Sequence, residues 1–157
     1  MYFVGILFSL FVIYAAAEKV PFIPCRDSTS VLGVAIHPCN SLDIEGWRTC
    51  VVSRQTVIRV QAAVLPPFDA LNLETVASAS VNNHLIHLPH SGINPCVENI
   101  MPSCPLIKDE MYIFTFHFNV LFYSPSVRMQ ILFIVRDKNT KMNLGCVKLP
   151  IMIDPES

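Results

Sequence analysis

The chain has 157 residues, 52% of them apolar, and its 11 Lys and Arg residues nearly balance its 12 Asp and Glu residues. A chain this apolar and this weakly charged can bury enough surface to offset the entropy of ordering, which excludes intrinsic disorder. The length fits one domain. Nucleic acid is not an expected partner, because the chain has no run of Lys and Arg that could neutralise phosphates.

Residues 1–17 predict a secretory signal peptide. They contain no charged side chain, and an apolar run over 3–14 is followed by Ala15, Ala16 and Ala17, which form an A-x-A cleavage site before Glu18. The apolar run spans about 12 residues, whereas a membrane-spanning helix needs roughly 20, so an N-terminal anchor is the weaker alternative. We therefore expect a secreted, extracellular protein whose mature domain covers residues 18–157.

All six cysteines lie in this mature part. An even number of cysteines in an exported chain indicates three disulfides, because the export route is oxidising. The C-x-x-C pairs typical of zinc sites do not occur. Spacing alone does not choose among the many pairings that six cysteines allow.

In the first half of the mature chain, apolar residues recur with the period of two that is typical of β-strands. A short strand is expected over 34–36, ending at Pro38, and a longer one over 58–64, ending at Pro66 and Pro67. The stretch 75–88 is ambiguous because both of its faces carry apolar residues. We interpret it as one strand.

The second half begins with a strand over 112–122 that has a strongly aromatic face. Pro125 breaks the chain before a strand over 127–135, and a polar turn leads to a last strand over 147–153. In that last strand Pro150 predicts an edge position or a bulge, because proline cannot donate to a ladder. About seven strands and no long helix predict a β-sandwich or barrel.

Catalytic and metal-binding patterns are weak. His84, His87 and His90 come closest to a ligand set, but in a strand His87 faces away from the other two, and the H-E-x-x-H spacing is missing. No nucleophile elbow occurs either, so we expect neither an enzyme nor a cofactor or metal. Trp47, the only tryptophan, lies between Cys39 and Cys50 in a segment interpreted as a loop, where it either packs on the loop or contacts a partner.

Several short segments are carried in a fixed order by the whole mature chain. They are Val-Ala-Ile-His-Pro-Cys at 34–39, Cys-Pro-Leu-Ile-Lys-Asp at 104–109 followed by Tyr112, Pro-Ser-Val at 125–127, Asp-Lys-Asn at 137–139, and Cys146 followed by Leu-Pro-Ile at 149–151. Each segment is weak alone, but their combination with the six cysteines is fairly specific. On these residues the chain resembles the ML family of secreted lipid-recognition domains.

The resemblance implies an immunoglobulin-like β-sandwich of two antiparallel sheets that enclose a small hydrophobic ligand. It also implies the disulfides Cys25–Cys146, Cys39–Cys50 and Cys96–Cys104. At delivery we expect a membrane or a receptor as the partner. Inward-facing residues of three strands would line the cavity. These positions are Ile58, Val60, Val64, Phe116, Phe118, Val120, Val127, Met129, Ile131 and Phe133.

Two functions follow as hypotheses. The first is a secreted carrier of a fatty acid, a sterol or a similar lipid, and the alternative is an immune or receptor-interaction module that recognises microbial glycolipid. Periodicity cannot separate a hollow sandwich from a fully packed one. The chain has no Asn-x-Ser/Thr site, which favours an extracellular fluid as its place of action, while protonation of the His84 to His90 segment is the alternative basis for release in acid.

Overall fold

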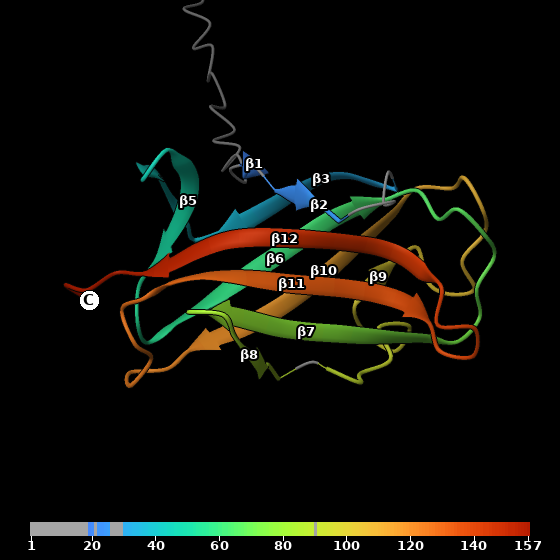
Figure 1. The fold of residues 1–157 in the computed structure, drawn as a ribbon. Helices are drawn as coiled ribbons and strands as arrows, with labels where there is room; N and C mark the ends of the chain where they lie inside the picture. Colours follow the sequence, from blue (N-terminus) through green and yellow to red (C-terminus); the bar gives the residue numbers. More distant parts are fainter. Residues whose placement is uncertain (1–18, 21, 26–29, 90) are drawn as a thin grey trace, which may run out of the picture.

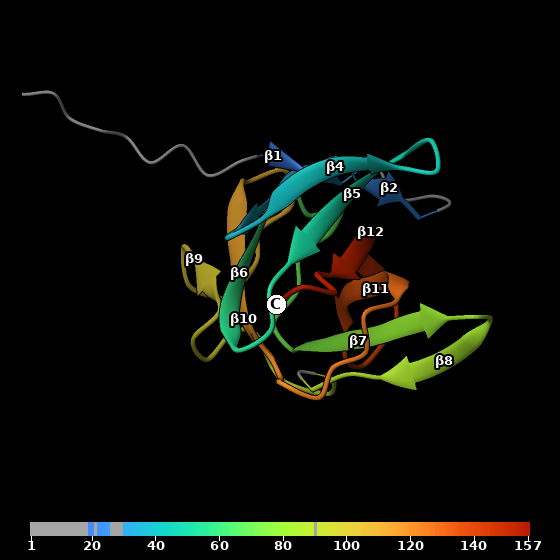
Figure 2. The same ribbon diagram turned by 90° about the vertical axis from the view of Figure 1, so that its left-hand side faces the viewer.

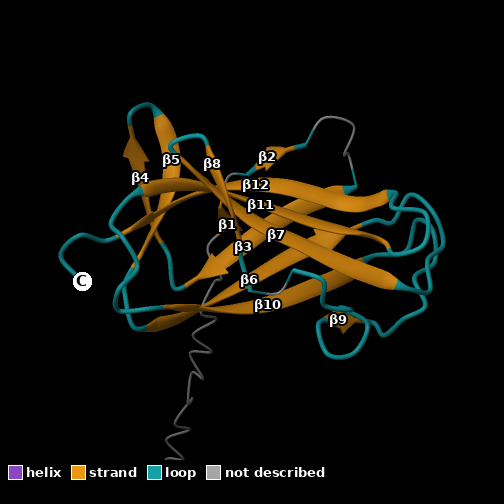
Figure 3. Ribbon diagram, turned by 60° about the horizontal axis from the view of Figure 1, so that its bottom comes forward, coloured by secondary structure: helices purple, strands orange, loops and turns teal. Residues whose placement is uncertain are grey.

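The computed structural model describes residues 19–20, 22–25, 30–89 and 91–157, so the expected signal peptide lies outside the described residues. The described residues form twelve strands and no helix (Figures 1 and 3). In chain order the strands are β1 (Lys19–Val20), β2 (Ile23–Pro24), β3 (Val31–His37), β4 (Asn40–Ile44), β5 (Trp47–Val52), β6 (Thr56–Val64), β7 (Leu73–Val81), β8 (His84–His87), β9 (Ile100–Met101), β10 (Tyr112–Val120), β11 (Arg128–Asp137) and β12 (Asn143–Ile153). None of the described residues lies in a helix with the length and hydropathy that a bilayer crossing requires.

The strands form two facing sheets. The first has the order β1-β3-β6-β10-β9, and the second has the order β4-β5-β12-β11-β7-β8, with β2 also paired to β12. Every pairing is antiparallel except that of β5 with β12. The prediction of an all-β sandwich is confirmed. The number of strands exceeds seven for two reasons. Short strands extend both sheets, and two segments, one predicted as a single strand and one as a loop, are hairpins of two strands each.

The single strand predicted over 75–88 is wrong, because the chain reverses there and forms the β7–β8 hairpin. Asn82 (φ 48°) and Asn83 (φ 64°) occupy the left-handed region that two-residue hairpin turns require and that asparagine tolerates. The reversal places Ile86 opposite Ala79. Both residues therefore face the same side of the sheet, which a continuous strand would not allow.

The loop predicted between Cys39 and Cys50 is also wrong. This segment is the β4–β5 hairpin, whose turn residues Glu45 (φ 52°) and Gly46 (φ 79°) again lie in the left-handed region. Trp47 is the first residue of β5 and pairs with Ile44, so it lies on a strand rather than in a loop.

Two predicted strand ends differ from the structure. Strand β10 ends at Val120, and Phe122 lies beyond it with 69% of its surface exposed. Strand β11 begins at Arg128, so Val127 belongs to the preceding loop. In both cases the apolar alternation of the sequence extends beyond the residues that are paired in a ladder. On β10, for example, Val120 is the last residue that pairs with β6.

The edge position predicted from Pro150 is wrong, but the alternative, a bulge, is present in β12, where the register against β11 shifts between Gly145 and Asn143. Strand β12 is an interior strand that pairs with β11 along its length, and Pro150 lies opposite Gln130. On its other side β12 pairs with β2 at Val147 and Lys148 and with β5 from Ile151 onward. Within the described residues Pro150 thus falls where one side of the strand has no ladder partner, a place where proline is tolerated.

Three disulfides tie the sandwich together, in the pairing that the resemblance implies. Cys25–Cys146 connects the segment after β2 to β12, across a sequence separation of 121. Cys39–Cys50 closes the β4–β5 hairpin, and Cys96–Cys104 closes a loop before β10 with a separation of 8.

A hydrogen bond ties the start of β10 to the segment before it. The hydroxyl of the buried Tyr112 accepts this bond from the Ile107 N–H at 2.9 Å.

A cluster of charged side chains around Glu74 links the stability of the fold to pH. Its Oε1 accepts hydrogen bonds from Lys141 Nζ at 2.6 Å and Arg136 Nε at 2.7 Å, which together hold the pKa of Glu74 below its ordinary value of 4.5. The N–H groups of Thr140 and Asn139 lower the pKa of Asp137 in the same way.

A carboxylate whose pKa is lower in the folded state stabilises the fold above its unfolded-state pKa, and this contribution is lost as the pH falls through the folded-state value. We therefore expect the free energy of unfolding to decline below about pH 4.5. The decline should be shallower in Glu74→Gln, as measured by urea denaturation over a pH series. An identical decline in both proteins would contradict the assignment.

Candidate functional site

The described residues of the two sheets line two spaces between them. The larger, which we call the mouth cavity, has a volume of about 400 Å³ and lies at the end of the sandwich where β5 and β12 end and β6 begins. It is lined by Val52, Ile58, Ala79, Val81, Ile86, Leu88, Pro89, His117, Phe118, Asn119, Val120, Leu121, Ser124, Pro125, Met129, Ile131, Ile151 and Ile153. Most of this lining is apolar.

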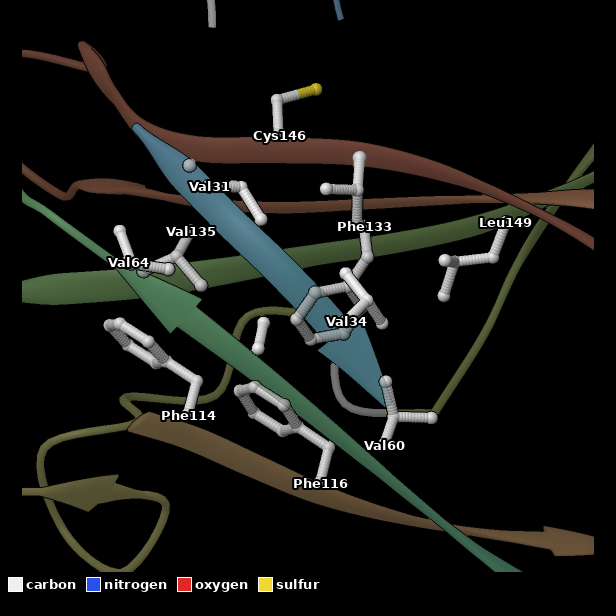
Figure 4. A pocket seen from close by; sticks show the side chains of 13 residues that line it. Val31, Val34, Val60, Val64, Phe114, Phe116, Phe133, Val135, Cys146 and Leu149 are labelled. Atoms are coloured by element: carbon white, nitrogen blue, oxygen red, sulfur yellow. The ribbon is translucent and has the colours of Figure 1, made fainter. Parts of the chain in front are cut away.

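The smaller space, which we call the deep cavity, has a volume of about 30 Å³ and lies between β3, β6 and β10 of the first sheet and β11 and β12 of the second (Figure 4). It is lined by Val31, Val34, Val60, Ala62, Val64, Phe114, Phe116, Phe133, Val135, Gly145, Cys146, Val147 and Leu149. A space this small has room for about one water molecule, and its apolar lining offers water no hydrogen bonds.

An aromatic partition separates the two cavities. The rings of Phe116 and Phe133, which reach from opposite sheets, have centroids 4.5 Å apart, and Phe118 meets Phe133 edge-on at 6.1 Å. Phe116 and Phe133 line the deep cavity, while Phe118 lines the mouth cavity. On β11, Ile131 lines the mouth cavity and Phe133 lines the deep cavity. The boundary between the cavities therefore lies at the same height on both sheets.

The predicted ligand-contacting residues divide between these two spaces. Ile58, Phe118, Val120, Met129 and Ile131 line the mouth cavity, and Val60, Val64, Phe116 and Phe133 line the deep cavity. Val127, in the loop before β11, lines neither of them. Contact of any of these residues with a ligand remains a prediction.

Residues of the β7–β8 hairpin complete the mouth cavity, and sequence reasoning missed them. Ala79, Val81 and Ile86 line it, followed by Leu88 just after β8. The small side chain of Ala79 leaves room where a larger residue would fill the gap between the sheets. The Asn82-Asn83 pair was the signal that could have identified this hairpin and thus the inward position of Ile86.

An apolar rim surrounds the opening. In the β10–β11 loop, Phe122 and Tyr123 are each 69% exposed, and their rings meet edge-on at 5.1 Å. On β8, Ile86 is 51% exposed. Leu121, Ile86 and the neighbouring Pro125 also line the cavity, so the exposed apolar surface is continuous with the cavity wall.

Arg54 holds the loop that carries half of this rim. Its Nε donates to the Ser124 carbonyl at 2.8 Å, its Nη2 donates to Ser126 Oγ, and its Nη1 donates to the carbonyls of Asp154 and Ser157 at 3.2 and 2.9 Å. One guanidinium thus connects the β10–β11 loop to the segment after β12. Since Ser124 lines the mouth cavity, the Arg54 contacts fix part of the opening.

Replacing Arg54 with Met is expected to release an apolar dye from the mouth cavity several-fold faster, because the loop loses charged hydrogen bonds worth roughly 1.5–3 kcal/mol each when buried and less when exposed. Stopped-flow dilution of the dye-loaded protein measures this rate. Arg59→Met is the matched control, since Arg59 is an exposed residue of β6. Equal release rates from the two variants would show that Arg54 does not hold the opening.

The polar groups near the mouth cavity are few. Among the described residues, no three His, Cys, Asp or Glu side chains come together as metal ligands. His84 and His87 are exposed on β8, three residues apart and so on opposite faces, and His90 lies outside the described residues. The polar residues in the lining of the mouth cavity are His117, Asn119 and Ser124.

Comparison with known proteins agrees with this geometry. The crystal structure of a Niemann-Pick type C2 protein from the Japanese carpenter ant has a TM-score of 0.70 and 23% identity, and the match covers 85% of this chain and 99% of the ant protein. Chicken MD-1, solved in complex with lipid IVa, has a TM-score of 0.53 and 11% identity, over 85% of this chain and 94% of MD-1. At these identities the two likenesses show the fold.

No curated protein gives a significant match. A family model described as the ML domain matches residues 19–153, which is nearly all of the expected mature chain. The sandwich, the three disulfides and the apolar space between the sheets have the arrangement that the resemblance implies. The chain belongs to the ML-domain family of lipid-binding β-sandwich proteins.

Proposed function

We propose that this protein is a secreted carrier that binds one small hydrophobic ligand, a fatty acid, a sterol or a related lipid, in the mouth cavity. The observation that carries the proposal is a space of about 400 Å³ whose lining is almost entirely apolar and which opens at one end of the sandwich. The role consists of binding and release, without chemical conversion. Export rests on the predicted signal peptide and on the three disulfides, which persist in oxidising compartments.

Burial alone can supply the affinity. Each buried CH₂ contributes about 0.8 kcal/mol, so a tail of about fifteen carbons offers on the order of 10 kcal/mol before the cost of ordering is subtracted. A polar head group would lie at the opening, near Ser124 of the β10–β11 loop. Shape and length of the tail would then set selectivity.

Delivery would use the apolar rim. Phe122, Tyr123 and Ile86 expose large side chains around the opening, and exposed apolar patches of this kind mark sites of protein or membrane contact. A ligand that passed directly from the cavity into a membrane or a receptor would avoid water. The rim therefore supports a membrane or a receptor as the partner at delivery.

Expression of the full chain in secreting cells tests the proposal as a whole. We expect the protein in the medium, beginning at Glu18, and native mass spectrometry followed by lipid extraction should recover an apolar ligand in stoichiometric amount. An apolar fluorescent dye should displace that ligand. A secreted protein that carries no lipid and binds no dye would favour the interaction-module alternative, and a protein retained in the membrane would contradict the signal peptide.

Replacing Val120 with Trp is expected to abolish dye binding. Val120 is 8% exposed and lines the mouth cavity, so the larger side chain must occupy ligand space, at a cost of roughly 1–3 kcal/mol in folding free energy for overpacking. Val57→Trp is the matched control, because Val57 is 54% exposed on a strand paired with β10. A folded Val120→Trp protein that binds dye like the parent would place the ligand elsewhere.

A further inference from the structure

The outer face of the second sheet carries a groove that is separate from the mouth cavity. It has a volume of about 300 Å³, which is within the range of small-molecule sites. Its lining consists of Trp47, Ser80, Asn82, Asn83, Arg128, Met129, Gln130 and Pro150. We call it the Trp47 groove. Met129 is the one residue that lines both this groove and the mouth cavity.

Two hairpins form its walls. Figure 2 shows the turns of β4–β5 and β7–β8 projecting to the same side of the sheet, with β11 and β12 between them. The two hairpins lie at opposite ends of the strand order, so Trp47 on one wall faces Asn82 and Asn83 on the other across the central strands. Gln130 of β11 and Pro150 of β12 supply the floor.

The walls are fixed before any ligand arrives. Each hairpin has a two-residue turn in the left-handed conformation, and ladder pairs close it directly, Ile44 with Trp47 and Val81 with His84. A ligand would therefore lose little of its binding free energy to ordering the site.

The chemistry of the groove suits a neutral, hydroxyl-rich ring. Trp47 leaves 53% of its surface exposed, so the indole offers an apolar face that an apolar ring face can cover. The amides of Asn82, Asn83 and Gln130 both donate and accept hydrogen bonds, as hydroxyl groups also do. Arg128, the cation in the lining, is paired with Glu45 at 2.9 Å, which leaves no unbalanced charge to attract an anion.

We propose that the Trp47 groove binds a neutral carbohydrate, with a pyranose ring stacked on Trp47 and its hydroxyl groups hydrogen-bonded to the surrounding amides. An apolar lipid tail would leave these amides unpaired, at a cost in affinity. A charged ligand would have to compete with the ion pair between Arg128 and Glu45. The site is distinct from the lipid carrier role and does not depend on it.

The only tryptophan of the chain provides the test, because its fluorescence reports on the groove directly. The secreted protein is titrated with the tetrasaccharides of N-acetylglucosamine, mannose and glucose. We expect at least one of them to shift the Trp47 emission in a saturable way. Gln130→Ala and Asn83→Gly should each weaken that binding about tenfold, as expected for one lost hydrogen bond. Glycine keeps the left-handed turn at position 83 while removing the amide.

Calorimetry with Trp47→Ala gives a second readout, in which sugar binding should be lost while the affinity of the apolar dye for the mouth cavity stays at the parent value. Failure of dye binding in the parent would count against the carrier role alone. The carbohydrate site is overturned if no tetrasaccharide shifts the emission. It is also overturned if Gln130→Ala and Asn83→Gly bind the sugar as tightly as the parent does, or if only the apolar dye shifts the emission.

Discussion

Phe133→Ala is expected to join the two cavities and to make the protein accept a longer lipid tail. Phe133 belongs to the aromatic partition, where its ring lies 4.5 Å from that of Phe116, and it is 9% exposed. Removing the ring opens a path from the mouth cavity to the deep cavity. A bound tail could then extend past Val60 and Leu149, which now line only the deep cavity.

The same substitution should lower the free energy of unfolding by about 3–5 kcal/mol, since a buried Phe loses both its transfer free energy and its packing. Urea denaturation measures this loss, and competition against the dye with fatty acids of increasing chain length measures the change in selectivity. A bound ligand should recover part of the lost stability, because it binds only the folded state.

Phe114→Ala is the control that separates the loss of stability from the change in the preferred tail length. Phe114 is 1% exposed and lines the deep cavity, but it belongs to neither of the ring contacts that form the partition. Its replacement should cost similar stability and leave the preferred chain length unchanged. If both variants prefer the parent's chain length, the deep cavity does not take part in binding. If both prefer longer chains, the partition is not what limits the tail.

The sequence alone could not predict that the space between the sheets is divided into two cavities. A period of two identifies which residues of a strand face inward, and the inward sets of β6, β10 and β11 were read in this way. The level at which a cavity ends depends on which residues of different strands stand opposite one another. That register, which pairs Phe116 with Val60 and Phe133 with Ala77, is a property of the assembled sheets.

The errors of the sequence analysis lie in turns and strand ends. Both missed hairpins have tight turns with left-handed residues, and only Gly46 is of the type most expected there. The Trp47 groove depends on these two hairpins, so the incorrect loop and the incorrect single strand together concealed it. Phe122 was assigned to the aromatic face by its spacing, but alternation alone does not show where a ladder ends.

Removing the Cys25–Cys146 disulfide is expected to be the most destabilising of the changes considered. In the chain-entropy model a disulfide stabilises by restricting the unfolded chain, and closure over a separation of 121 is worth about 5 kcal/mol, against about 2.5 kcal/mol for the separation of 8 in Cys96–Cys104. In the folded state β2 pairs with β12 at Ile23 and Pro24, and the Cys25 N–H donates to the Cys146 carbonyl at 3.3 Å.

The measurement compares two double variants, Cys25→Ala with Cys146→Ala, and Cys96→Ala with Cys104→Ala, by urea denaturation under oxidising conditions. The first should lose about twice as much free energy of unfolding as the second. While it remains folded, it should still bind the dye, because only Cys146 of the pair touches a cavity, and that is the deep one. A larger loss from the Cys96–Cys104 variant would mean that folded-state contacts around that loop, rather than restriction of the unfolded chain, dominate disulfide stabilisation in this sandwich.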